Sequence, residues 1–498
     1  MSFIDIGDLY LDKNEPRQAG LYNAIRDKIL MAQWTAESRL PATRVLAEQL
    51  SISRNTVTAT YDQLKAEGYI DSVRGSGYFV SLLPPERFLS VEDISVKTVE
   101  KEDQTPRKTF RSAESQALTR NRPFQPGVPD LDGFPYKKWT RFLQRQSGRA
   151  LFSGQNDPQG AEALRRSISH YLVSSRSVDC CPERVIVTQG AQQAIYIALS
   201  VLMKSGEPIV VENPGYKQML NTAEHLDLQC LPVNIINGKG VDTTSLSGLK
   251  AKCLYLTPSN HYPMGCGIGT GDRIACIEWA QKHNAWIIED DYDTEFQFGN
   301  KPFPSLQGLA TRMSGGQPNI VYIGTFSKTM LPSLRIGYMV VPDTLVEKCL
   351  AVKEIIGGNT AVHSELALSE FIDSGDYLRH IRKMRRSYQT KCYLFISLLR
   401  TELKGQVEIL SQEAGMHVTF GWTQGPSAVR IAAMLEKEKI SIRTLEGYKY
   451  KNVSIDNTYP PADNILIAGF GNASEVQIRE GVKILAECFN RKPDISDK

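Results

Sequence analysis

The sequence has little that would place it in a membrane or outside the cell. No apolar run reaches the roughly 18 residues that a membrane-spanning helix needs, and residues 1–16 are acidic and lack the apolar centre of a secretory signal. The nine cysteines form no CxxC pair, which argues against a structural zinc site or a disulfide framework. These absences favour a reducing cytoplasm.

A large charge of one sign is also missing. The chain has 58 Lys and Arg against 55 Asp and Glu, a formal net charge of +3. A balance this even excludes binding to a polyanion through overall charge alone. A DNA-binding surface would therefore have to be local.

The composition changes along the chain. For 498 residues we expect about three folded units, and 41% hydrophobic residues suffice to build sizeable cores. We predict a helix-rich domain over residues 1–82, a linker rich in proline and alternating charge over 83–118, and a large domain over 119–498.

The large C-terminal part alternates between short apolar runs and amphipathic segments of helical spacing. This pattern predicts an α/β fold, a mostly parallel sheet covered by helices on both faces. The runs that we expect as strands are Val185–Val187, Pro208–Val211, Cys253–Leu256, Trp286–Ile288 and Ile320–Ile323.

The N-terminal part has the pattern of a winged helix-turn-helix, in which the third helix enters the major groove of DNA. After Gly68, two short strands form the wing, with Gly75 and Gly77 at its tip. The expected helices span residues 19–33, 44–50 and 54–67, the last two capped by Thr43 and Ser53.

The start of the third helix carries side chains suited to DNA. Free backbone N–H groups and the positive helix end favour a phosphate there. Arg54 and Asn55 are placed to reach base edges, and Arg44 and Arg74 to hold the DNA backbone. On this pattern alone, a small helical domain with ordinary surface arginines is an equal alternative, because its charges nearly cancel.

Three stretches over residues 20–80 decide between these alternatives: Arg39–Arg44 (RLPATR), Ser53–Val57 (SRNTV) and Arg74–Val80 (RGSGYFV). They closely resemble the GntR-type winged-helix DNA-binding domain. The resemblance implies DNA contacts at the second and third helices and at the wing tip. With the two side chains added from chemistry, the expected DNA-binding residues are Arg44, Ser53, Arg54, Asn55, Thr56, Arg74 and Gly75.

A lysine stands among small hydroxyl residues at the end of an expected strand. Thr325-Phe-Ser327-Lys328 directly follows that strand, and Arg335 comes seven residues later. An amine there can form a Schiff base with an aldehyde cofactor, while hydroxyls and an arginine meet a phosphate. The alternative is a surface lysine in a loop.

Carboxylates follow another expected strand, in Glu289-Asp-Asp-Tyr-Asp293. Ligands bind at this edge of a parallel α/β sheet. An aspartate there can pair with a pyridinium nitrogen and keep it protonated, which makes pyridoxal phosphate an electron sink. An acidic loop or a metal site is the alternative, although no histidine stands at ligand spacing.

Two elements are weak when taken alone. In Thr188–Ala194 (TQGAQQA), a glycine between a strand and a helix offers N–H groups to a phosphate. In Glu212–Tyr216 (ENPGY), an aromatic ring on a turn can stack on a cofactor ring. Many strand–helix turns carry a glycine or a tyrosine without binding anything.

Together, these elements resemble the fold type I aminotransferases from about residue 122 to the end. Further matching pieces are Phe124–Asp130 (FQPGVPD), Phe134–Trp139 (FPYKKW), Asp157–Gly160 (DPQG), Thr257–Gly265 (TPSNHYPMG) and Gly415–His417 (GMH). The resemblance implies pyridoxal 5'-phosphate as the cofactor. It implies that Lys328 forms the Schiff base, Asp290 pairs with the ring nitrogen and Tyr216 stacks on the ring. The remaining implied positions are Tyr292 near the phenolic oxygen, and Thr325, Ser327, Arg335, Gly190, Ala191 and Gln192 around the phosphate.

A GntR-type domain, a linker and an aminotransferase-like domain in this order resemble the MocR subfamily of bacterial transcription regulators. The expected fold is therefore multidomain, an N-terminal winged helix-turn-helix and an α/β domain of the pyridoxal-phosphate-dependent fold type I. The resemblance also implies a cytoplasmic, head-to-tail homodimer that binds promoter DNA.

The chain departs from the aminotransferase pattern where a substrate carboxylate would bind. The arginine usual three residues before Phe470 is replaced by Ile467, and Gln218 stands where GabR-like regulators have another arginine. Tyr262 replaces the asparagine of the NPxG motif. Arg443 is the residue that we expect to bind an effector carboxylate instead. Fewer anchors favour sensing over turnover.

Two functions follow. The first is a regulator that senses pyridoxal phosphate itself, or an amine or amino acid through it, and controls genes of vitamin B6 or amino-acid metabolism. The second is an active aminotransferase with a DNA-binding appendage, against which the missing arginine argues.

Overall fold

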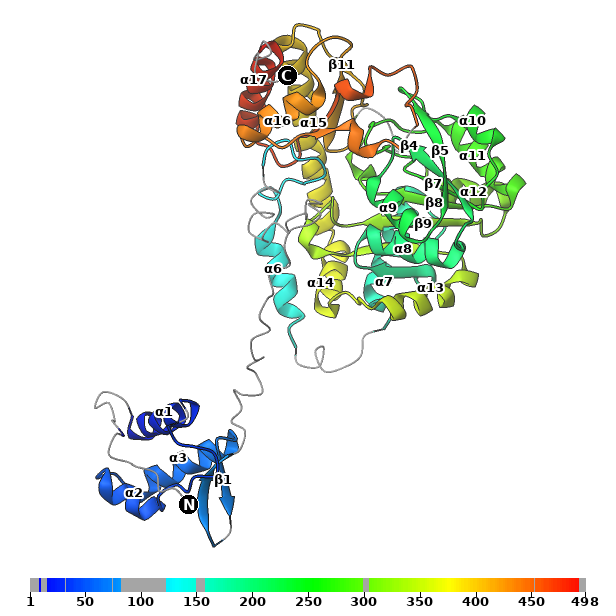
Figure 1. Cartoon of the computed structure of the whole chain (residues 1–498). Coiled ribbons are helices and arrows are strands. Elements are labelled where there is room, and N and C mark those ends of the chain that lie inside the picture. The colour runs from blue at the N-terminus through cyan, green and yellow to red at the C-terminus, as the bar shows by residue number, and fades with distance from the viewer. Residues whose placement is uncertain are drawn as a thin grey trace. The chain divides into compact units, whose positions relative to one another are not determined.

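The computed structural model describes residues 9, 16–31, 33–73, 75–81, 122–148, 157–298, 304–451 and 453–491. The chain divides into two compact units, Met1–Thr109 and Phe110–Lys498 (Figure 1). Arg74 and the linker expected over 83–118 lie outside the described residues. The domain boundaries set in the sequence analysis therefore stay a prediction.

The N-terminal unit is a winged helix-turn-helix, as predicted. Its elements are α1 (Arg17–Leu30), α2 (Thr43–Gln49), α3 (Arg54–Ala66), β1 (Ile70–Val73) and β2 (Gly77–Val80). The two strands pair antiparallel and form the wing. The helices enclose a small apolar core whose fully buried members include Leu21, Ile25, Leu46, Val57, Tyr61 and Leu64.

The two expected helix caps differ in outcome. Ser53 caps α3, because its Oγ accepts the N–H of Thr56 at 3.1 Å. Thr43 does not cap α2, so that prediction is wrong. Ala42 holds the N-cap position in extended backbone, and Thr43 is already the first helical residue, with no side-chain cap.

The large unit is built on an eight-stranded sheet with strand order β3-β10-β9-β8-β7-β4-β5-β6. All five strands expected from the sequence are present, and β4, β5, β7, β8 and β9 pair in parallel. In the described sheet, β10 pairs antiparallel with both of its neighbours, β3 and β9, and β6 pairs antiparallel with β5. The strands are β3 (Val185–Thr188), β4 (Pro208–Asn213), β5 (Gln229–Ile236), β6 (Gly240–Val241), β7 (Cys253–Leu256), β8 (Trp286–Asp291), β9 (Ile320–Thr325) and β10 (Gly337–Val340).

Helices cover both faces of this sheet (Figure 1), and its inner strand β7 is apolar and buried at every position, as a strand covered on both sides must be. In β7, Leu254 and Leu256 pack on one face with α11 (Thr270–His283) and α12 (Leu306–Ser314). Cys253 and Tyr255 belong to the core on the other face, which contains α8 (Ala191–Leu202), α9 (Lys217–His225) and α13 (Asp343–Ile356). α10 (Thr243–Gly248) packs beside α11.

A second, four-stranded sheet has the order β11-β12-β14-β13 and packs with the C-terminal helices. Its strands are β11 (Glu408–Ile409), β12 (His417–Gly421), β13 (Arg443–Thr444) and β14 (Ile465–Gly469). The remaining helices are α6 (Tyr136–Arg145), α7 (Glu162–Arg176), α14 (Val362–Asp373), α15 (Asp376–Glu402), α16 (Ala428–Lys437) and α17 (Glu475–Asn490). None of the described helices has the length and apolar composition to cross a membrane. All nine cysteines are unbridged.

Candidate functional site

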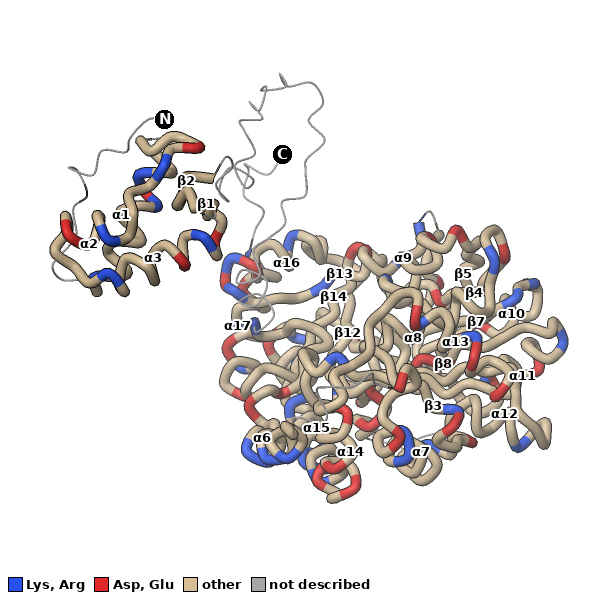
Figure 2. Tube along the Cα trace, turned by 90° about the horizontal axis from the view of Figure 1, so that it is seen from below, with Lys and Arg blue, Asp and Glu red and all other residues tan. Residues whose placement is uncertain are grey.

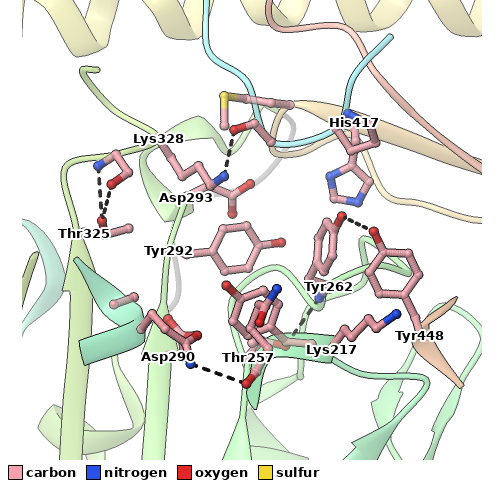
Figure 3. Close-up of a pocket in the computed structure, with 18 of the residues that line it drawn as sticks. Lys217, Thr257, Tyr262, Asp290, Tyr292, Asp293, Thr325, Lys328, His417 and Tyr448 are labelled. Carbon is pink, nitrogen blue, oxygen red and sulfur yellow. Dashed lines mark hydrogen bonds between the residues drawn. The ribbon is translucent and has the colours of Figure 1, made fainter. Parts of the chain in front are cut away.

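A cavity of about 560 Å³ lies where the carboxyl ends of the parallel strands meet the second sheet (Figure 3). This is the edge at which α/β sheets bind ligands. The cavity collects the following residues that the sequence singled out: Ala191, Gln192, Tyr216, Asp290, Tyr292, Thr325, Ser327, Lys328, Arg335 and Arg443. Gly190 packs directly beside it, against the Arg335 side chain.

Lys328 follows β9 and turns its amine into the cavity. Its Nζ donates a hydrogen bond to the carbonyl oxygen of Gly127 at 2.7 Å. Gly127 has φ +77°, and a Cβ there would lie 2.7 Å from this Nζ. Any larger residue at this position would therefore collide with the amine where it now lies. Burial lowers the pKa of Lys328, and the carboxylates of Asp293 and Asp290 oppose that shift. A lowered pKa supplies more of the neutral amine, the form that reacts with an aldehyde.

Asp290 is the penultimate residue of β8 and is 4% exposed. Its Oδ2 accepts a hydrogen bond from the hydroxyl of Tyr255 at 2.6 Å, while its Oδ1 has no hydrogen-bond partner among the described residues. Burial raises the pKa of the Asp290 carboxyl to about 6, against the hydrogen bond from Tyr255. An unpartnered oxygen on a buried carboxylate is costly unless a ligand donates to it.

Two other carboxylates of this acidic run, Glu289 and Asp291, point elsewhere. Glu289 accepts the backbone N–H groups of Leu306 and Gln307 at the start of α12. Asp291 pairs with Arg176 at 2.6 Å. The described residues hold no group of three His, Cys, Asp or Glu that could bind a metal.

Polar groups of the kind that suit an anion gather in a corner at the ends of β3 and β9. Thr325 Oγ1 accepts the backbone N–H of Ser327 at 3.1 Å, and Arg335 donates to the carbonyl of Gln189 at 2.9 Å. Gly190 has φ +83° and begins the 12-residue helix α8. Hydroxyls, an arginine and the N-terminus of a helix together suit a phosphate group.

Three tyrosines and a histidine surround Tyr262 and form an aromatic wall with it, of which Figure 3 labels Tyr262, Tyr292, Tyr448 and His417. The ring of Tyr262 makes edge contacts with its neighbours at centroid distances of 5.3–6.3 Å, and its hydroxyl lies 3.0 Å from that of Tyr448. The neighbours are Tyr216, Tyr292, Tyr448 and His417. The hydroxyl of Tyr292 is buried and has no partner among the described residues.

Besides Arg335, two further cations line the cavity without an acidic partner in the described part of the chain, Lys217 at the start of α9 and Arg443 in β13. Arg443 is the register partner of Ile467 in β14. Ile467 itself is fully buried. Arg443 therefore supplies a cationic side chain from the strand next to the one where aminotransferases carry their arginine.

The N-terminal unit presents the start of α3 to solvent. Ser53, Arg54 and Asn55 are exposed, whereas Val57 and Tyr61 are buried in the core. Ser53 and Thr56 share a hydrogen bond between their hydroxyls at 2.8 Å.

Arg44 is exposed and pairs with Glu48 at 3.2 Å, a surface contact that costs little to break. Gly75 lies exposed in the wing at φ +81°. Basic and acidic residues are interspersed over the described part of this unit (Figure 2), so a DNA surface there rests on particular side chains.

Sequence reasoning missed three side chains of the cavity: Asp293, Lys217 and Tyr448. Asp293 belongs to the acidic run noted in the sequence, but the orientation of its side chain depends on a hydrogen bond from Asn260. Tyr448 stands in a segment without a motif and reaches Tyr262 from 186 residues away. Lys217 follows Tyr216 directly, so its helix-start position was a usable signal.

Comparison with protein families gives two matches. Residues 127–454 match the family described as aminotransferase class I and II, and residues 17–80 match the bacterial regulatory proteins of the gntR family. The chain is 33% identical over 488 residues to the probable rhizopine catabolism regulatory protein MocR of Rhizobium meliloti, covering 96% of this chain and 94% of the relative. It is 27% identical over 474 residues to the pyridoxine biosynthesis transcriptional regulator PdxR of Corynebacterium glutamicum, covering 94% and 95%.

Solved structures share the fold of the large unit. The α-aminoadipate aminotransferase LysN of Thermus thermophilus, complexed with N-(5'-phosphopyridoxyl)-L-leucine, matches with a TM-score of 0.67 at 22% identity, over 76% of this chain and 95% of that one. The kynurenine aminotransferase of Pyrococcus horikoshii matches with a TM-score of 0.66 at 21% identity, over the same shares.

Proposed function

Given that the chain belongs to the MocR-type transcriptional regulators of the GntR family, we propose that its aminotransferase-like domain binds pyridoxal phosphate at Lys328 and senses an amine that carries an anionic group. The observation that carries this proposal is the pairing, in one cavity, of the Lys328 amine with the unpartnered Oδ1 of Asp290. The proposal includes a homodimer that binds promoter DNA in the cytoplasm.

The residues around the cavity fit pyridoxal phosphate. The free oxygen of Asp290 suits a protonated ring nitrogen, the corner at Thr325, Ser327 and Arg335 suits the phosphate, and Tyr216 offers a ring to stack on. When bound, the cofactor supplies an aldehyde that condenses with primary amines. Lys328 would hold it covalently, and an amine that reached the cavity would compete with Lys328.

The effector class follows from the charges left over. If Arg335 binds the cofactor phosphate, Lys217 and Arg443 are the cations that still line the cavity. Neither has a carboxylate beside it in the described part of the chain. An anionic group on the effector would satisfy both, because charge-assisted hydrogen bonds are the strongest of their kind. The effector would place its amine near Lys328 and its anionic group near Arg443.

DNA affinity would respond if the ligand favours one of two conformations of the regulator. The segment that follows the expected linker offers a route by which a change at Lys328 reaches the linker. In this segment, the carbonyl oxygen of Gly127 accepts a hydrogen bond from the Lys328 amine. The backbone of Phe124 forms an antiparallel bridge with Gly469 of β14. A change in the bonding of Lys328 would therefore act directly on Gly127 and its neighbours, which lie shortly after the expected linker.

The test is the absorption spectrum of the protein loaded with pyridoxal phosphate, recorded before and after a panel of amines. We expect the visible band of lysine-bound cofactor, and its loss or shift on adding amines that carry a carboxylate or sulfonate. A band that no amine changes would favour the cofactor itself as the signal. The absence of any band would contradict the assignment of Lys328.

Replacing Arg443 with methionine should weaken the response to anionic amines by about 10- to 100-fold, because a hydrogen bond to a charged group contributes roughly 1.5–3 kcal/mol. The measurement is the amine concentration that half-converts the visible band. The band before amine addition should be unchanged, since Arg443 lies in β13 of the second sheet, whereas Asp290 and Thr325 belong to β8 and β9 of the first. An equal loss for an uncharged amine of similar size would contradict the role of Arg443.

A further inference from the structure

Two neighbouring helices of the large unit carry an unbalanced positive charge. Between Tyr377 and Thr401, α15 has seven Lys or Arg and no Asp or Glu. Helix α6 has four Lys or Arg and likewise no acidic residue. Because the whole chain has a formal net charge of only +3, this positive charge is a local feature of the two helices.

The two helices lie side by side. Lys138 of α6 pairs with Asp376, the first residue of α15. Lys383 of α15 donates a hydrogen bond at 3.1 Å to the carbonyl oxygen of Gly133, three residues before α6. Figure 2 shows Lys and Arg gathered on α6, next to α15. Side chains of both helices therefore contribute to one surface.

The basic side chains of this surface point to solvent. All four Lys and Arg of α6 are exposed, whereas its Trp139 and Phe142 are buried in the core. On α15, four exposed Lys and Arg recur at positions i, i+3, i+4 and i+7, the spacing of a single helix face. The apolar sides of both helices thus face the core and leave the charges outside.

Three of these eight exposed cations already have an acidic partner. Lys138 and Arg379 share Asp376, and Arg145 pairs with Glu370 at 3.3 Å. The other five form no ion pair within the described part of the chain, and none of them lines the cavity at Lys328. These five, called the basic face below, are Lys137, Arg141, Arg382, Lys383 and Arg386.

The chemistry of the basic face suits a phosphate backbone. Its charges are spread over two exposed helices, which fits an extended polyanion, and three of the five are arginines, the side chain that best matches phosphate oxygens. DNA is the polyanion that the gntR-family match over residues 17–80 brings to this chain. A duplex held by that domain is at high local concentration around the large unit, because both belong to one chain.

We propose that the basic face binds the phosphate backbone of the DNA that flanks the operator, as a second contact surface of the regulator. Its cations displace counterions from the duplex and add affinity without reading bases, while the N-terminal unit selects the sequence. This role rests on the promoter binding included in the proposed function, and it is independent of pyridoxal phosphate.

The test compares two duplexes by fluorescence anisotropy with the full-length protein. One is the shortest operator duplex that the wild type still binds, and the other extends it by about two helical turns of unrelated sequence at each end. The wild type should bind the extended duplex about 10-fold more tightly at low salt. Its affinity should also fall more steeply with salt, because each phosphate contact adds about 0.9 to that slope.

Replacing Arg141, Arg382 and Arg386 together with glutamine should remove most of the gain from the extension. The salt slope on the extended duplex should become smaller by about 2 to 3, since three phosphate contacts are lost. Affinity for the short duplex should stay the same. All three side chains are exposed, so the fold should be unaffected.

The matched control removes the same number of positive charges elsewhere on the large unit. Lys282→Gln, Arg312→Gln and Lys348→Gln are combined, which neutralises exposed cations of α11, α12 and α13. This variant should keep both the gain and the salt slope of the wild type. The comparison separates a local contact from a loss of overall charge.

Equal affinity of the wild type for both duplexes, or an equal loss in the control variant, would overturn the proposal. It would also be overturned if the extension added nothing and vesicles containing phosphatidylserine bound the wild type but not the arginine variant, because the partner would then be a membrane. A protein that bound both duplexes as expected but no pyridoxal phosphate would contradict the proposed function and leave the basic face in place. The two hypotheses can therefore fail separately.

Discussion

Replacing Lys328 with alanine should abolish the visible band of lysine-bound pyridoxal phosphate and every spectral response to amines. The methyl group of alanine has no amine to condense with the aldehyde, and the remaining contacts at Asp290 and Thr325 hold the ligand only non-covalently. Borohydride reduction followed by mass spectrometry should then find the cofactor on Lys328 in the wild type and on no peptide of the variant.

The variant should stay folded, because the amine makes a single hydrogen bond within the described part of the chain, to Gly127. Lys348→Ala, an exposed lysine of α13, is the control and should keep the band. A Lys328→Ala protein that still showed the band, or still answered amines at its promoter, would contradict the proposed sensing mechanism.

The second large effect is expected at the start of α3. Replacing Arg54 and Asn55 together with alanine should weaken binding to a selected operator by about 100-fold or more, since each good base contact is worth roughly 1–3 kcal/mol. Both side chains are exposed and absent from the core, so the fold should be unaffected. Fluorescence anisotropy on labelled duplex at fixed salt measures the change.

Lys65→Ala serves as the control, because Lys65 is exposed in the last turn of the same helix. It should lower affinity by no more than one phosphate contact would. Equal losses in the two variants would mean that α3 does not enter the groove by its N-terminal end.

Sequence reasoning succeeded where the signal is local. The apolar runs that became β7 and β9 are readable because strands buried on both faces need no polar positions. Lys328 and Asp290 were identifiable because each lies at the carboxyl end of such a strand or shortly after it, and the ends of parallel strands converge. Ser53 was found as a cap because its partner is three residues away.

It failed where the decisive contact is distant. Thr43 and Ser53 look alike in sequence, yet the extended backbone at Ala42 moved the helix start and left Thr43 without a capping role. Asp293 acquires its orientation from Asn260, 33 residues earlier. Tyr448 reaches Tyr262 from 186 residues away, a contact that no local pattern records.

The central claim is that the state of Lys328 sets DNA affinity, and an equilibrium titration tests it directly. A duplex selected by the protein from random sequence is titrated with wild type and Lys328→Ala, each without ligand, with pyridoxal phosphate, and with the cofactor plus a responsive amine. We predict that the dissociation constant of the wild type changes by about fivefold or more between these states, a typical coupling free energy, and that the variant keeps one value. Equal dissociation constants for the wild type in all three states would contradict the account.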